Sequence, residues 1–178
     1  MGVNNAKPHL IILPEDYANE QIAHGFHRSI SNKGQVQILN KAKGWRKVIN
    51  KFIDDHACKM LNKNRIMVLL IDFDEDQNRR EQAIKIINDD LPVHNKEAIL
   101  KAISERLFIL GVFSDPEKLR GDKEIKQIVD KNKFDEIGRK LAEDCEGTNS
   151  NGIWKHKLLE HNKNDLNRMN QLVKHFLF

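Results

Sequence analysis

Acidic residues that directly follow a short apolar segment are the clearest chemical signal in this sequence. The run 66–71 (Ile-Met-Val-Leu-Leu-Ile) is followed by Asp72, Asp74, Glu75 and Asp76. An unbroken apolar run of this length is typical of a strand covered on both faces, as in a parallel sheet. In extended chain, residues two apart point the same way, so Asp72 and Asp74 could share one ion. Hard cations such as Mg²⁺ prefer oxygen ligands, and a cation would offset the repulsion among these acids.

A second apolar run, 9–13, is also expected to form a strand, and Pro14 ends it. Glu15 would then lie at the carboxyl end of this strand, and Glu20 in the first turn of the helix that follows. Ligands of open α/β sheets bind beyond the carboxyl ends of the strands. A simpler explanation for an acid such as Glu20 stays open, because the helix dipole alone favours acids near a helix N-terminus.

Further oxygen ligands follow the apolar run 106–113, where Ser114, Asp115 and Glu117 stand close together. They could join the other acids at the same edge of the sheet. The alternative is an ordinary capped helix, because Ser and Asp are common N-caps and Pro116 suits the first helical position.

Basic residues are concentrated in one part of the chain. Residues 28–65 contain ten Lys and Arg but two acids, a local charge of +8, whereas the whole chain carries +4. An uneven basic surface is typical of nucleic-acid binding, although a solvated lysine-rich surface is equally consistent with it. Within this segment, Arg46 and Lys47 are our candidates for nucleic-acid contacts. Trp45 beside them is expected in the core rather than stacked on a base.

Two other groups of side chains could act on a phosphate. Arg79 and Arg80 begin the helix predicted after the acidic strand, where they could hold a phosphate or pair with the neighbouring acids. Lys155 lies in a basic cluster with His156 and His161 before the last predicted helix. The two histidines are candidates for phosphate binding or proton transfer, although surface histidines usually do neither.

The predicted elements alternate between strand and helix, which indicates an α/β fold with a mainly parallel four-stranded sheet flanked by helices. Strands are predicted at 9–13, 35–39, 66–71 and 106–113, and helices at 22–30, 45–61, 77–90, 96–104, 125–141 and 166–176. With 178 residues, one domain is expected, residues 8–120 forming its α/β part and residues 121–178 a helical extension packed on it.

The composition limits the class of protein and the compartment that we expect. Charged residues make up 31% of the chain and hydrophobic residues 39%, which fits a globular protein. No apolar run is long enough to cross a membrane, and residues 1–7 lack the apolar part of a signal peptide. We therefore expect a cytoplasmic protein without membrane contacts, in which Cys58 and Cys145 are reduced thiols.

The order of strands and acids resembles the Toprim domain of topoisomerases, primases and nucleases of the OLD type. That family has a Glu after the first strand, matched by Glu15, and an Asp-x-Asp after the third, matched by Asp72 and Asp74. OLD-type nucleases add an acid shortly after the first Glu, which Glu20 fits, and a Ser-x-Glu after a later strand. Ser114 and Glu117 fit that last motif with one extra residue between them, and Asp115 is an alternative ligand.

The resemblance covers about residues 8–120 and implies a nuclease that uses Mg²⁺ or Mn²⁺ held by Glu15, Glu20, Asp72, Asp74, Ser114 and Glu117. Glu15 would act as general acid or base, and Lys155 or Arg79 would neutralise developing charge. The chain also resembles small stand-alone Toprim-like proteins of prokaryotic anti-phage defence loci, which implies an ABC-type ATPase as a possible partner. The oligomeric state stays open.

Two other functions remain open. The first is a non-catalytic subunit that binds nucleic acid or regulates an ATPase complex. The second is a phosphatase of the haloacid dehalogenase type, in which the first Asp of an Asp-x-Asp is the nucleophile. That motif usually follows the first strand with Thr or Val after it, whereas here it follows the third strand and Glu75 comes next.

Overall fold

The sheet of this protein has four strands, and all of them are parallel. The computed structural model describes residues 6–92, 94–129, 131, 133–146 and 152–178. The strands are β1 (His9–Pro14), β2 (Val36–Ile38), β3 (Arg65–Leu70) and β4 (Leu107–Leu110), in the order β2-β1-β3-β4. The predicted α/β class and parallel sheet are therefore confirmed.

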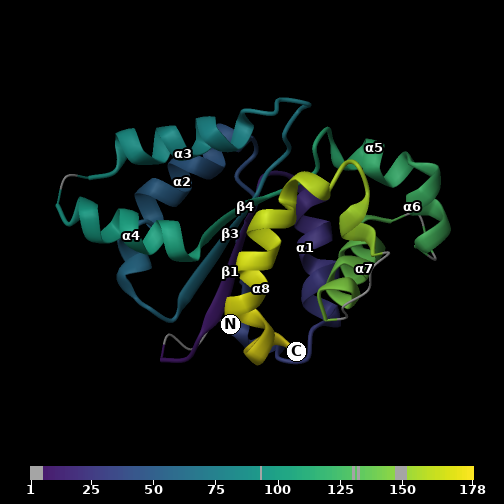
Figure 1. The fold of residues 1–178 in the computed structure, drawn as a ribbon, viewed down its shortest axis with the longest axis horizontal. Helices are drawn as coiled ribbons and strands as arrows, with labels where there is room; N and C mark the ends of the chain where they lie inside the picture. The colour runs from purple at the N-terminus through teal and green to yellow at the C-terminus, as the bar shows by residue number, and fades with distance from the viewer. Residues whose placement is uncertain (1–5, 93, 130, 132, 147–151) are drawn as a thin grey trace.

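Helices cover both faces of the sheet (Figure 1). One face packs against α1 (Tyr17–Ser29), α5 (Pro116–Gly121), α6 (Lys123–Ile128), α7 (Phe134–Glu146) and α8 (Lys163–Leu177); the other packs against α2 (Trp45–Asp55), α3 (Arg79–Asp90) and α4 (Lys96–Arg106). Successive strand residues point to opposite faces, so Leu10 and Val68 join the first core and Ile11 and Leu69 the second. Cover on both sides explains the unbroken apolar runs.

The strand order creates a switch point between β1 and β3. The chain leaves β1 to form β2 on one side, then returns to form β3 on the other side of β1. In open α/β sheets, ligands bind outside the carboxyl ends of the strands at such a point. Pairing continues past the strand ends, because the backbone N–H of Glu15 donates to the carbonyl of Leu70 at 2.9 Å. The residues that follow β1 and β3 are thus fixed side by side.

The helix predicted over residues 45–61 is shorter than expected. The helix α2 ends at Asp55, and the last apolar residues of the stripe form a separate 3-10 turn, Cys58–Leu61. The break is at His56, which has non-helical backbone angles and whose Nδ1 lies 2.8 Å from the guanidinium of Arg65. Both side chains are buried. This contact with the start of β3 ends the helix, and a periodic apolar pattern does not reveal it.

The C-terminal part of the chain is joined to the sheet through a close contact between α1 and α7. A Cβ added at Gly25 would lie 1.9 Å from the backbone oxygen of Asp135, and one at Gly138 would lie 1.9 Å from that of Ile22. Only glycine lets the two backbones approach this closely. The region 125–141, predicted as one or two helices, forms two, α6 and α7.

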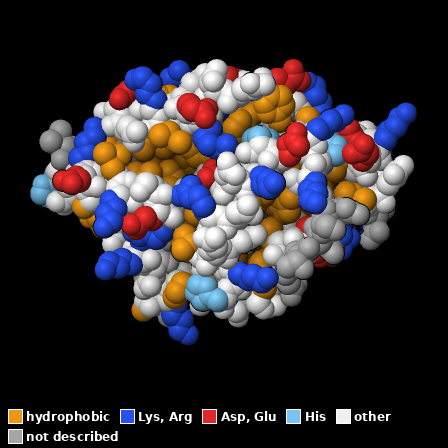
Figure 2. Space-filling model, viewed as in Figure 1, with side chains coloured by type: hydrophobic (Ala, Val, Ile, Leu, Met, Phe, Trp, Pro, Cys, Tyr) orange, Lys and Arg blue, Asp and Glu red, His pale blue; other side chains and the backbone are white. Residues whose placement is uncertain are grey.

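Charged side chains are mixed on the face that carries α8. Figure 2 shows Lys and Arg side chains interspersed with Asp and Glu, with apolar patches between them. On this face, basic residues therefore do not form a surface of a single sign. Among the described residues, no helix is long and apolar enough to span a membrane.

Candidate functional site

Glu15 and Asp72 meet at the switch point. The carboxylate Oε2 of Glu15 accepts a hydrogen bond of 2.9 Å from the backbone N–H of Asp72, and the backbone N–H of Trp45 also donates to Glu15. Trp45 is the first residue of α2, so the Glu15 carboxylate lies at the N-terminus of that helix. The structure thus brings together two acids that are far apart in the sequence.

The carboxyl group of Asp72 is buried among other acids. Its Oδ1 accepts a hydrogen bond of 2.9 Å from Nδ2 of Asn19, which also donates to Asp16 at 3.1 Å. Burial raises the pKa of Asp72 to about 8; the charges of Glu15, Asp16 and Asp74 act in the same direction, against the hydrogen bond from Asn19. Burial also raises the pKa of Glu15, opposed by the N–H of Asp72. A cation here would favour the charged forms of both acids.

Asp74 departs from the extended geometry that the sequence suggests. Its φ is +48° and that of Glu75 is +62°, so the chain turns sharply after Phe73 and the two-residue alternation ends. The Asp74 carboxylate is 59% exposed and lies 3.2 Å from the guanidinium of Arg79. Asp74 remains close enough for its charge to raise the pKa of Asp72, and its carboxylate pairs with Arg79.

The other predicted ligands differ in whether their side chains already have partners within the protein. Glu20 pairs with Lys41 at 2.8 Å. Asp115 caps α5 by accepting from the N–H of Lys118 at 2.7 Å, and Glu117 is exposed in the first turn of that helix, as in the alternative explanation of this segment. Ser114 differs, because its hydroxyl is buried without a hydrogen-bond partner among the described residues.

Ser114 also lies next to the acidic loop, since its carbonyl accepts from the N–H of Asp74 at 3.2 Å. Of the predicted ligands, the structure therefore brings Glu15 and Asp72 together, and the buried Ser114 belongs to the segment that bonds to the Asp74 loop. These are hard oxygen donors, the chemistry that Mg²⁺ and Mn²⁺ accept.

Basic residues flank the acids at the start of two helices. Arg46 and Lys47 are exposed in the first turn of α2. Trp45 is half-buried, and the guanidinium groups of Arg46 and Arg79 lie 4.9 and 4.5 Å from its ring centroid. Arg79 is 11% exposed on its side chain and also faces Asp76 at 3.9 Å. The sequence left open whether Arg79 holds a phosphate or pairs with the neighbouring acids, and in the structure it pairs with the acids.

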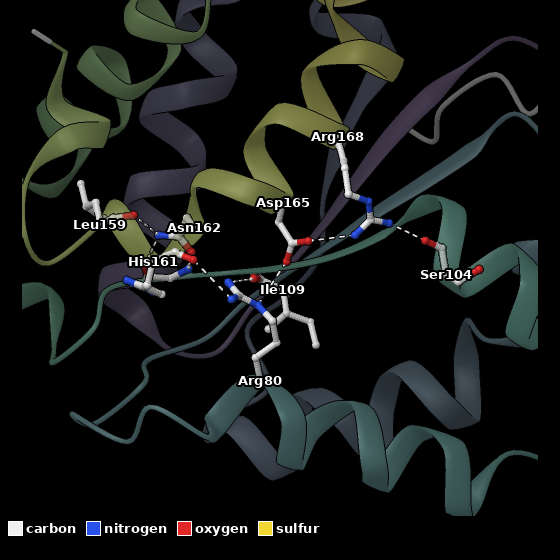
Figure 3. Close-up of polar contacts among 9 residues, drawn as sticks. Arg80, Ser104, Ile109, Leu159, His161, Asn162, Asp165 and Arg168 are labelled. Carbon is white, nitrogen blue, oxygen red and sulfur yellow. Dashed lines mark hydrogen bonds and ion pairs between the residues drawn. The ribbon is translucent and has the colours of Figure 1, made fainter. Parts of the chain in front are cut away.

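Arg80 is held by the C-terminal part of the chain (Figure 3). Its guanidinium pairs with Asp165 at 3.2 Å and donates to the carbonyls of Ile109 at 3.1 Å and His161 at 3.3 Å. These bonds join α3, β4 and α8. In this arrangement Arg80 acts as a structural link, and a contact with nucleic acid would have to compete with it.

Lys155 lines a separate cavity, and His161 packs against two aromatic rings. Lys155 lines a cavity of about 630 Å³ beside α7 and α8, whose lining includes Lys163 and Asp144 but none of the predicted metal ligands. His161 packs against the rings of Phe73 and Phe113, with centroids 4.4 and 5.7 Å away. Burial and the charge of Arg80 lower the pKa of His161 to about 4, so this imidazole is neutral at pH 7.

A second group of side chains in the described structure could bind a metal ion. It consists of Asp122, Glu124 and His156, whose ligand atoms all lie within 4.8 Å of one another. His156 is buried, Asp122 is half-buried and Glu124 is exposed. The sequence marked His156 as a candidate but missed the two acids. The signal available was weak, an Asp-x-Glu at a helix start 32 residues before the histidine.

No family model, curated protein or solved structure matches this chain.

Proposed function

We propose that this protein is a nuclease that uses Mg²⁺ or Mn²⁺ to hydrolyse phosphodiester bonds of DNA or RNA. One observation carries the proposal: Glu15 and Asp72 meet at the carboxyl ends of two neighbouring parallel strands, with Asp72 buried beside other acids. This edge is where open α/β sheets bind ligands. A buried acid beside a half-buried one, both with raised pKa values, is expected where a cation or a reacting group is held.

The residues have separate roles in this proposal. Glu15 and Asp72 hold the ion, and Asp74 joins them when it leaves Arg79. A bound divalent ion would activate water and stabilise the charge on the scissile phosphate. By the resemblance to Toprim-domain nucleases, Glu15 also serves as the general acid or base. Once released from Asp74, Arg79 is placed to pair with the phosphate.

Arg46 and Lys47 extend the site toward the nucleic-acid backbone. Both lie in the first turn of α2, whose first residue, Trp45, donates its backbone N–H to Glu15. Basic side chains next to a phosphate-cleaving site position the substrate through its backbone charge, without reading sequence. A basic turn within one residue of a Glu15 contact is the arrangement that a nuclease needs.

The resemblance to Toprim-domain nucleases of the OLD type supports the same assignment. It rests on Glu15 after the first strand and Asp72-x-Asp74 after the third, and these motifs follow adjacent strands β1 and β3. On this resemblance we propose a cytoplasmic role in anti-phage defence, with an ABC-type ATPase as partner.

The proposal is tested by incubating the protein with single- and double-stranded DNA and RNA oligonucleotides, with Mg²⁺, Mn²⁺ or EDTA. Cleavage is expected with metal only. The variant Asp72→Asn should lose at least about 100-fold in rate, because it removes a charged ligand. Asp89→Asn, which changes an exposed acid at the end of α3, should retain full activity. Undiminished cleavage by Asp72→Asn would overturn the assignment.

A second candidate function has its own support. The pairs Asp74–Arg79 and Glu20–Lys41 neutralise two of the predicted ligands, which favours a non-catalytic subunit that binds nucleic acid or regulates an ATPase. Calorimetry with Mn²⁺ separates the two. A nuclease should lose one Mn²⁺ site in Asp72→Asn, whereas a non-catalytic subunit should bind oligonucleotides equally well in EDTA and cleave none of them.

A further inference from the structure

The group formed by Asp122, Glu124 and His156 stands outside the proposed nuclease site. Asp122 lies between α5 and α6 and caps the latter, Glu124 is in the first turn of α6, and His156 follows the 3-10 turn Ile153–Lys155. The group therefore joins two parts of the chain that are more than 30 residues apart. We propose that it is a separate binding site for a divalent transition-metal ion of the Zn²⁺ type.

The distances fit two ligands of one ion better than a direct hydrogen bond. Nε2 of His156 lies 3.4 Å from Oδ1 of Asp122 and 3.8 Å from Oε2 of Glu124. Hydrogen bonds between nitrogen and oxygen are usually about 2.7–3.2 Å long. Two atoms bound at about 2.1 Å to one tetrahedral zinc ion lie about 3.4 Å apart. The two distances from Nε2 are thus close to the spacing that a shared ion would impose, and the two carboxylate oxygens lie within 4.8 Å of each other.

The imidazole supplies an observation independent of the acids. The His156 side chain is 3% exposed, and its Nε2 is buried without a hydrogen-bond partner among the described residues. A buried nitrogen whose contacts with carboxylates are 3.4 and 3.8 Å long is poorly satisfied, and such groups in native structures call for an explanation. An ion between Nε2 and the two carboxylates provides one.

Two of the three ligands are held in place by the backbone. The carbonyl of His156 accepts from the N–H groups of Leu159 at 2.7 Å and Glu160 at 2.9 Å, and the N–H of His156 donates to Ile153 at 3.0 Å. Asp122 Oδ1 accepts from the N–H of Glu124 at 2.9 Å. Glu124 is 80% exposed and completes the set from the solvent side. An ion bound here would keep water in its remaining positions, as open sites do.

Two contacts oppose the ion and limit its affinity. The N–H of Leu158 donates to His156 Nδ1 at 3.3 Å, which favours the tautomer with the proton on Nε2. An ion on Nε2 requires the proton on Nδ1, so this long bond must be given up. Lys157 also lies 3.7 Å from Oδ2 of Asp122 and competes for that carboxylate. Since one imidazole and two carboxylates suit Zn²⁺ and Mn²⁺ better than Mg²⁺, we expect preference for the transition metals.

The test is calorimetry with Zn²⁺ on the full chain carrying Asp72→Asn, which removes the proposed nuclease ligand. One Zn²⁺ should bind, and adding His156→Gln should weaken binding at least tenfold. His175→Gln, which changes an exposed histidine in α8, should leave the affinity unchanged. Binding should also raise Tm by at least about 4 °C at about 100-fold excess of Zn²⁺ over its Kd.

Glu124→Gln provides a test that does not depend on a buried residue, because this side chain is exposed. It should weaken Zn²⁺ binding several-fold, whereas Glu81→Gln, an exposed acid in the first turn of α3, should not. Unchanged affinity in both His156→Gln and Glu124→Gln would overturn the proposal. Because the background lacks the Asp72 carboxylate, this result and the result of the nuclease assay are independent.

Discussion

The Glu15 carboxylate accepts a 2.9 Å hydrogen bond from the backbone N–H of Asp72, 57 residues further along the chain. This bond holds one acid against the residue that carries the other. The ionised form of Glu15 is the better acceptor, but burial and then the nearby charges of Asp16 and Asp74 raise its pKa and oppose ionisation. At this edge of the sheet, the fold thus holds acids close together although burial and mutual repulsion disfavour their ionised forms. A bound cation would offset that repulsion.

The first prediction concerns Asp72 and pH. Its pKa of about 8 in the folded protein lies above its ordinary value of 3.8, so the folded state holds a proton that the unfolded state releases. Stability should fall as pH rises from about 4 to 8, and the full cost should be present above about pH 8. The variant Asp72→Asn places an uncharged amide at this position, and its side-chain oxygen could still accept from Asn19. It should thus match wild type at about pH 4 and exceed it by at least about 1 kcal/mol at about pH 8.

Urea unfolding in EDTA at about pH 4, 6 and 8 measures this difference. Asp89→Asn serves as the control, because its carboxylate is exposed and pairs with Lys85 on the same helix. A stabilisation by Asp72→Asn that did not grow between the lowest and the highest pH would contradict the raised pKa.

The second prediction concerns the ion pair between Asp74 and Arg79. If Arg79 competes with a metal ion for Asp74, Arg79→Gln should tighten Mn²⁺ binding and Asp74→Asn should weaken it, each by several-fold. Neither should change stability by more than about 1 kcal/mol through the ion pair, because the Asp74 side is exposed. Calorimetry with Mn²⁺ gives the affinities. Lys85→Gln, a charge change farther along α3, should have no effect, and equal affinities in all three variants would exclude the competition.

Much of the fold follows from the sequence, because β1, β3 and β4 lie in apolar runs, each followed by acids, whereas β2 is short and alternating. The pairing of Glu15 with Asp72 also follows from the expectation that parallel strand ends meet at one edge. The directions of the side chains that come after the strands cannot be predicted from the sequence. The positive φ of Asp74 depends on bonds to the loop after β4, where the carbonyl of Ser114 accepts from Asp74 and that of Phe113 accepts from Glu75.

The partners of the other charged residues are equally invisible in the sequence. Glu20 meets Lys41, and Arg80 meets Asp165, only once the helices have packed. The group of Asp122, Glu124 and His156, which could bind a metal ion, has no periodic spacing that a sequence pattern could reveal. Its two parts converge because the segment after α7 returns to the start of α6. Local patterns therefore predict elements well and predict side-chain partners across elements poorly.

The third prediction concerns the contact between α1 and α7. Gly138→Ala would place a Cβ 1.9 Å from the backbone oxygen of Ile22, so the two helices must separate. We expect a loss of about 3 kcal/mol or more in the free energy of unfolding. Gly121→Ala, where no atom lies within 4 Å of the added Cβ, should change stability by less than about 1 kcal/mol. Similar unfolding curves for both variants would show that α7 is not held this closely.

The last prediction concerns Asn162, whose side chain replaces a neighbouring strand at the end of β4. Its Nδ2 donates to the carbonyl of Gly111 at 2.7 Å and its Oδ1 accepts from the N–H of the same residue at 3.1 Å. The residue is fully buried and lies beside Asp165 in the network that ties α8 to β4 (Figure 3). Asn162→Ala would leave two buried backbone groups of Gly111 unpaired, at a cost of about 2–4 kcal/mol.

Thermal and urea unfolding measure the loss, and Asn164→Ala, an exposed neighbour in α8, is the matched control. Hydrogen exchange gives a sharper readout, because the amide of Gly111 should exchange much faster in Asn162→Ala while those of Leu69 and Met67 in β3 keep their order of protection. If Gly111 stayed protected, another group would have to cover the end of β4. The edge would then not depend on Asn162, and the C-terminal helix would be attached mainly through Arg80 and Asp165.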